Sequence, residues 1–117
     1  MPIDRDDTLK KAEKLVRQGK IDGAIAEYLR VVEDQPRDWT TANTLGDLYV
    51  RAGQPEQAAA QYARIAEHFM TEGFYPKASA IYKKLLKLTP NDVATAVIGV
   101  LDQTWPETFR PVIGSHP

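Results

Sequence analysis

The sequence predicts an all-α fold built from helical hairpins. Glycine, alanine and tyrosine recur together at a fixed spacing, short connections separate the apolar segments, and no stretch alternates apolar and polar residues long enough for a β-sheet. The chain has 117 residues, of which 43% are hydrophobic and 26% are charged, so it can bury a core and is not a disordered chain. We therefore expect one helical domain of ordinary size.

An internal repeat organises the chain. Glycine, then alanine five residues later and tyrosine nine residues later, occurs three times: at Gly19, Ala24 and Tyr28, at Gly53, Ala58 and Tyr62, and at Gly73, Ala78 and Tyr82. The second copy follows the first by 34 residues, whereas the third follows the second by only 20. Gly19 and Gly53 can adopt the left-handed conformation that ends a helix. Small residues seven positions before each glycine (Ala12, Gly46 and Ala66) would let neighbouring helices approach closely.

Six helices are predicted in order along the chain. Their expected ranges are residues 7–18, 22–34, 38–52, 55–72, 75–88 and 92–103. Asp22 and Asp38 are suitable N-caps because their carboxylates can accept hydrogen bonds from free backbone N–H groups. Pro55 and Pro76 suit first helical positions, where no donor is lost. The short connections favour antiparallel neighbours.

The last predicted helix and the residues after it differ from the rest. Residues 93–101 carry no charge, so a helix here is apolar nearly all round and needs cover on more than one side. The β-branched content of this segment leaves a strand open as the alternative. Residues 104–117 contain three prolines, and we expect an irregular tail.

The recurring residues resemble the tetratricopeptide repeat, a helix-turn-helix unit of about 34 residues. Two sets match its pattern: Ala12, Leu15, Gly19, Ala24, Tyr28 and Pro36, and then Leu45, Gly46, Tyr49, Gly53, Ala58 and Tyr62. The resemblance implies antiparallel helix-turn-helix repeats stacked as a short right-handed α-solenoid of five to six helices. We expect a repeat domain over residues 1–103, with units at 5–38, 39–72 and 59–92, a final helix at 92–103 and the tail at 104–117. The resemblance places Tyr28, Tyr62 and Tyr82 in the core.

The residue types argue against an enzyme, a cofactor site and a metal site. The chain has no cysteine, hence no thiolate ligand or nucleophile. Its glycines do not form a phosphate-binding loop, and Ser79 lies between alanines in a predicted helix, where a small packing residue is expected. His68 and Glu72 are one helical turn apart, but no third ligand is evident. We expect no catalytic residues, no cofactor and no metal.

Charge and hydropathy bound the class of partner. The net charge of −1 gives no general attraction to nucleic acid or anionic lipid. Basic residues cluster within 10–20 and 77–87, and we interpret both clusters as solvated helix faces, with nucleic-acid binding as a weaker hypothesis. No apolar run approaches the roughly 18 residues that cross a bilayer, and residues 1–7 do not form a secretory signal. We expect a cytoplasmic protein that binds neither nucleic acid nor membrane.

The resemblance also implies a concave groove lined by the first helix of each repeat. On this chain the groove positions are Leu9, Glu13, Val16, Asn43, Asp47, Val50 and Arg51. Their apolar members would bury area, and their polar members could hydrogen-bond an extended peptide or a partner helix. We therefore predict a non-catalytic scaffold for protein–protein interaction whose partner the sequence does not identify. The alternative is that these positions form the ordinary surface of a spacer repeat.

Some relatives bind a terminal carboxylate through a clamp of lysine, asparagine and arginine. The matching positions hold Leu9, Glu13, Thr44, Ala60 and Arg64. Only Arg64 suits the clamp, and the charge of Glu13 would repel a carboxylate. We do not expect this binding mode.

A second hypothesis is structural. The uncharged segment 93–101 would leave an apolar edge that another copy of the chain can cover, which predicts a homo-oligomer. The candidate self-association residues are Val93, Val97, Val100 and Leu101. The same segment could instead pack on a further repeat of a longer array.

Overall fold

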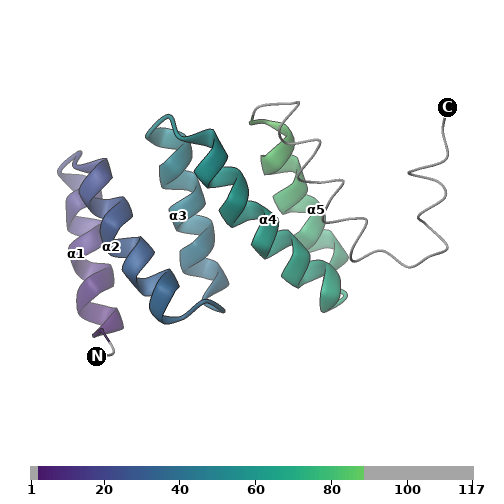
Figure 1. The fold of residues 1–117 in the computed structure, drawn as a ribbon, viewed down its shortest axis with the longest axis horizontal. Helices are drawn as coiled ribbons and strands as arrows, with labels where there is room; N and C mark the ends of the chain where they lie inside the picture. Colours follow the sequence, from purple (N-terminus) through teal and green to yellow (C-terminus); the bar gives the residue numbers. More distant parts are fainter. Residues whose placement is uncertain (1–2, 89–117) are drawn as a thin grey trace, which may run out of the picture. The chain divides into compact units, whose positions relative to one another are not determined.

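The computed structural model describes residues 3–88, which contain five helices and no strand. The helices are α1 (Arg5–Arg17), α2 (Ile21–Asp34), α3 (Trp39–Arg51), α4 (Pro55–Thr71) and α5 (Tyr75–Leu86) (Figure 1). Each begins and ends within two residues of its predicted range, and the predicted all-α class is confirmed. The helix predicted at 92–103, with its strand alternative, and the tail at 104–117 lie outside the described residues.

The three glycine turns share one backbone conformation. Gly19, Gly53 and Gly73 have φ values of 75°, 74° and 79°, so the left-handed conformation predicted for the first two is confirmed. In each turn the glycine N–H donates to the carbonyl oxygen three residues earlier, at 3.0–3.1 Å. The next N–H donates to the carbonyl oxygen five residues earlier, at 2.8–2.9 Å. This pair of bonds defines the Schellman motif, which satisfies the last carbonyls of α1, α3 and α4.

The helix starts follow the sequence in part. Asp38 is the N-cap of α3, and its carboxylate accepts a hydrogen bond from the Thr41 N–H at 3.2 Å. The N-cap predicted at Asp22 is wrong: α2 begins at Ile21, and Lys20 precedes it without a side-chain cap. Because only Lys20 separates the Gly19 turn from α2, Asp22 falls within the first turn, where its charge favours the helix dipole.

The prolines predicted at helix starts lie in the first turns. Pro55 is the first residue of α4, and Pro76 is the second residue of α5. Neither position requires a backbone donor.

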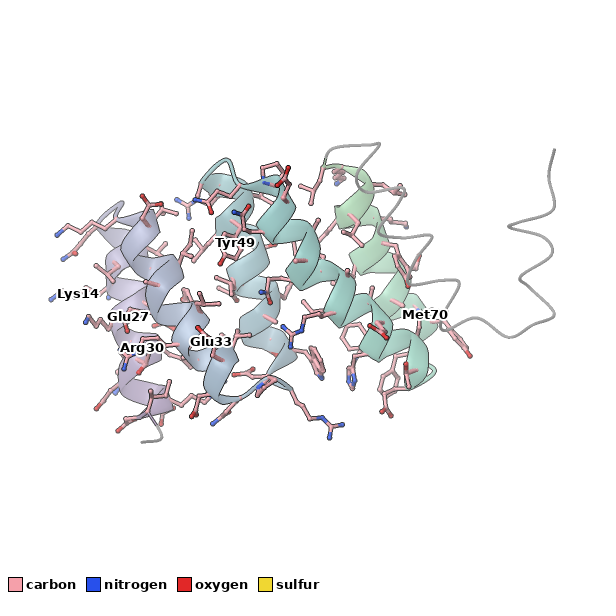
Figure 2. All side chains as sticks on the ribbon, in the orientation of Figure 1. Lys14, Glu27, Arg30, Glu33, Tyr49 and Met70 are labelled. Atoms are coloured by element: carbon pink, nitrogen blue, oxygen red, sulfur yellow. The ribbon has the colours of Figure 1, made fainter. Side chains whose placement is uncertain are left out.

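The chain divides into two compact units within α4, the first ending at Tyr62 and the second beginning at Ala63. In the first unit α1 packs on α2, and α2 packs on α3. Val31 and Leu45 are fully buried in its core. Glu27 on α2 binds Lys11 of α1 at 3.3 Å and Arg30 one turn along α2 at 3.1 Å. Figure 2 shows Glu27 and Arg30 close together along α2.

Gly46 of α3 lies against the ring of Tyr62 in the first unit. A Cβ atom on Gly46 would lie 2.5 Å from Cε1 of Tyr62, which is too close for two carbon atoms. The Tyr62 side chain is only 2% exposed, and its hydroxyl donates to the Asp47 carboxylate. The predicted use of a small residue at this crossing is therefore confirmed.

The second unit comprises the end of α4 and the hairpin with α5. Ile65, Ala78 and Leu85 are among its buried side chains. At the α4–α5 turn, Nζ of Lys77 lies 5.2 Å from the centroid of the Phe74 ring, within the range of a cation–π interaction. Phe74 itself is 48% exposed.

The three tyrosines predicted in the core differ in burial. Tyr28 and Tyr62 are buried, whereas Tyr82 is half-buried. The Tyr82 hydroxyl is enclosed, yet within the described part of the chain it has no hydrogen-bond partner. Burial and the nearby charge of Glu67 raise the pKa of Tyr82.

Between residues 3 and 88, no helix combines the length and apolar character needed to cross a membrane.

The bounds predicted for the individual repeat units stay a prediction.

Candidate functional site

A cavity of about 360 Å³ opens in the first unit. Residues of three helices line it: Glu13, Val16 and Arg17 from α1, Tyr28 from α2, and Thr44, Asp47, Leu48 and Arg51 from α3. We call this cavity the α1–α3 groove. Its volume lies within the range of about 300–1,000 Å³ that is typical of ligand pockets. It can therefore admit side chains of a bound molecule.

The charged residues of the α1–α3 groove occupy equivalent positions in successive repeats. Glu13 and Asp47 are 34 residues apart, as are Arg17 and Arg51. The groove therefore carries a pair of acids and, one turn further along α1 and α3, a pair of arginines. The two positive and two negative charges cancel.

Neither arginine forms an ion pair with another residue in the described part of the chain. Glu13 precedes Arg17 by four residues, and Asp47 precedes Arg51 by four, a spacing that favours ion pairs along a helix. Across residues 3–88, however, neither guanidinium lies within ion-pair distance of a carboxylate. Both groups are on exposed residues and keep their donors for another molecule.

Tyr28 adds a hydroxyl group to the lining of the groove. Its side chain is 6% exposed, and Leu48 beside it in the groove lining is also buried. Burial, together with the charge of Glu13, raises the pKa of the Tyr28 hydroxyl, which therefore stays protonated at neutral pH. The described residues offer this hydroxyl no hydrogen-bond partner, so it can bond to a ligand.

A hydrogen bond from a core residue holds the Asp47 side chain in position. Its carboxylate accepts a hydrogen bond from the buried Tyr62 hydroxyl. Burial first, and then the hydrogen bond and charge of Asp47, raise the pKa of Tyr62 well above its ordinary value. The hydroxyl therefore remains a donor, and this bond holds the Asp47 side chain in place.

The structure brings together four of the seven predicted groove positions. Glu13, Val16, Asp47 and Arg51 line the α1–α3 groove. The remaining three positions do not line it: Leu9 and Asn43 are half-buried, and Val50 is 43% exposed. The self-association residues Val93, Val97, Val100 and Leu101 lie outside the described residues.

Four lining residues were not among the predicted groove positions: Arg17, Tyr28, Thr44 and Leu48. The sequence held a signal for Arg17, because it stands 34 residues before Arg51. The sequence held no such signal for Tyr28, because the packing role predicted for this tyrosine already explained its place in the repeat. Only the packing of α2 against α1 and α3 brings one edge of this core residue to the groove.

A second cavity, of about 550 Å³, lies where α2 leads into α3. Its charged residues include Arg5 and Asp38, which bind each other: Nε and Nη2 of Arg5 lie 2.9 and 2.7 Å from Oδ2 of Asp38. Burial alone would raise the pKa of Asp38, but hydrogen bonds from Thr41 and Arg5 and the charge of Arg5 lower it below its ordinary value. This pair has a structural role that joins α1 to the start of α3.

Within residues 3–88, no three histidine, cysteine, aspartate or glutamate side chains lie together in a group suited to holding a metal ion. His68, the histidine considered as a ligand, instead has its ring centroid 5.6 Å from that of Phe69.

Residues 9–68, more than half of the chain, match the family model described as the tetratricopeptide repeat. The matched range contains every described residue that lines the α1–α3 groove. No curated protein and no solved structure gives a significant match to the chain.

Proposed function

Because the chain belongs to the tetratricopeptide repeat family, whose repeats generally mediate protein–protein interaction, we propose that it is a non-catalytic scaffold. In this proposal the α1–α3 groove binds a segment of a partner protein. The observation that carries the proposal is a cavity lined by equivalent positions of two successive repeats. Such a cavity displays the same side-chain positions twice, at the regular spacing of a repeat array.

The chemistry of the lining supports binding rather than catalysis. Among the described residues, the hydroxyls in the groove belong to Thr44 and Tyr28, and the lining holds no histidine or lysine. Thr44 Oγ1 is already engaged, because it donates to the Thr40 carbonyl oxygen at 3.2 Å. Among the described residues, neither hydroxyl is hydrogen-bonded to a carboxylate or an imidazole, the arrangement that usually activates a nucleophile for covalent catalysis.

Filling the groove tests the proposal. We expect Thr44→Trp to place a large ring in the cavity and to weaken partner binding at least about tenfold, which corresponds to about 1.4 kcal/mol. Peptides selected by the full chain from a random display library would be titrated against each variant by fluorescence anisotropy. Thr40→Trp is the matched control, because Thr40 is an exposed threonine of α3 that does not line the groove.

The two tryptophan variants separate the possible outcomes. The proposal requires the selected peptides to bind the Thr40→Trp variant as they bind the unmodified chain. It is wrong if those peptides bind the Thr44→Trp variant with unchanged affinity, or if the library yields no binding peptide. Circular dichroism of both variants checks that each remains helical.

A further inference from the structure

The arrangement of charges in the α1–α3 groove indicates what kind of segment it selects. Resting on the proposed function, we infer that the groove binds an extended segment bearing an acidic side chain and, two residues away, a basic one. The acidic side chain pairs with Arg17 and Arg51, and the basic one pairs with Glu13. The side chain between them points away from the groove, because successive side chains of an extended strand alternate in direction.

The groove presents two rows of charge: the acid row, formed by Glu13 and Asp47, and the arginine row, formed by Arg17 and Arg51. The distance between these rows along the helix axis matches the spacing of side chains on an extended backbone. Four residues of α-helix separate Glu13 from Arg17, a rise of about 6 Å along the axis. In an extended chain, side chains two residues apart lie on the same side and are separated by about 6.6 Å. A segment that runs along the groove can therefore place opposite charges at both rows.

The arginine row favours a carboxylate. Arg17 and Arg51 come from different helices, line the same cavity and have no carboxylate partner among residues 3–88. Guanidinium groups bind carboxylates through two parallel hydrogen bonds, so one acidic side chain can use donors from both arginines. The protonated Tyr28 hydroxyl supplies a further donor in the same lining.

The acid row determines the second charge. Glu13 is exposed and forms no ion pair with another described residue, whereas Asp47 already accepts the Tyr62 hydroxyl. Glu13 is therefore the principal partner for a basic side chain. A second acidic side chain at this row would face two carboxylates, and that repulsion excludes doubly acidic segments.

Short synthetic peptides test this selectivity. Four pentapeptides, acetylated at the N-terminus and amidated at the C-terminus, would have glycine at both ends and valine in the centre. Their second and fourth residues would be glutamate and lysine (the mixed-charge peptide), two glutamates, two lysines, or two glutamines. Each would be titrated into the full chain while the backbone and arginine Nε–Hε resonances are followed by NMR. We expect the mixed-charge peptide to bind at least about tenfold more tightly than the others and to shift the Nε–Hε signals of Arg17 and Arg51.

A charge-reversed variant sharpens the test. Glu13→Lys replaces the exposed carboxylate of the acid row with a positive charge. The protein should then prefer the peptide with two glutamates to the mixed-charge peptide. Glu33→Lys is the matched control: it makes the same change of charge at an exposed residue of α2 outside the groove and should keep the original preference.

The outcomes distinguish this inference from the function on which it rests. The inference is overturned if the neutral peptide binds as well as the mixed one, if no peptide shifts the arginine signals, or if Glu13→Lys leaves the preference unchanged. If one of these results is found and the Thr44→Trp variant still loses its binding to the library-selected peptides, the groove remains a binding site, but it does not select the mixed-charge segment. Unchanged binding by Thr44→Trp would remove both proposals.

Discussion

At the scale of single residues, Gly46 sets the distance between α3 and the Tyr62 ring. An added methyl group would lie 2.5 Å from Cε1 of Tyr62, and the rigid, buried ring cannot turn aside as a flexible side chain would. The same ring carries the hydroxyl that holds Asp47 at the groove. A change at Gly46 should therefore disturb both the core and the candidate site.

We expect Gly46→Ala to lower the free energy of unfolding by about 1–2 kcal/mol. Overpacking costs about 1–3 kcal/mol, and the higher helix propensity of alanine returns up to about 1 kcal/mol. Gly23→Ala is the control, because a Cβ atom there would meet Leu15 Cδ1 at 3.5 Å, an ordinary contact. Urea denaturation followed by circular dichroism should show a loss for Gly46→Ala and no loss for Gly23→Ala. Equal stability of the two variants would contradict the packing argument.

At the scale of elements, Asp38 connects two helices of the first unit. Its carboxylate caps α3 through the Thr41 N–H and also binds the guanidinium of Arg5 on α1. These interactions lower the pKa of Asp38 in the folded protein. Because the folded-state pKa lies below the unfolded value of about 3.9, the ionised carboxylate stabilises the fold above that pH and stops doing so as the pH falls through the folded value.

Asp38→Asn should reveal this dependence on pH. Asparagine can still cap the helix but carries no charge for Arg5, so we expect a loss of about 1 kcal/mol at pH 7. The difference from the unmodified chain should shrink toward zero below about pH 3, as the native carboxyl becomes protonated. Urea midpoints at several pH values measure it, with the exposed Asp34→Asn as control. A difference that stays constant with pH would contradict the role of the charge.

The elements were more predictable from the sequence than the groove. Helix ends depend on nearby residues: Gly19 and Gly53 end α1 and α3, and Pro55 begins α4. Asp22 was misassigned as a cap because the sequence did not show how few residues the Gly19 turn uses. The groove depends on which faces meet after packing, so Tyr28 could be assigned to the core but not to a cavity wall. Equivalent positions of successive repeats were the part of the site that local spacing could indicate.

At the scale of the whole molecule, the question is whether one chain acts alone. The hypothesis of self-association rests on residues 93–101, which carry no charge. If this hypothesis holds, light scattering should give a mass above the 13.1 kDa of one chain, and Val97→Lys with Leu101→Lys should reduce it to that value. A single-chain mass for the unmodified protein at high concentration would remove this alternative and leave groove binding unaffected.

The identical geometry of the three glycine turns has a consequence for how this protein can vary. A loop that is specified by one glycine and two backbone bonds leaves the side chains on either side of it largely unconstrained. Exposed residues at the ends of α1 and α3, such as Arg17 and Arg51, can then change identity without altering the course of the backbone. The two arginines of the groove are thus encoded at positions other than the glycines that fix these turns, and a new specificity could evolve by exchanging such exposed groups while the turns stay unchanged.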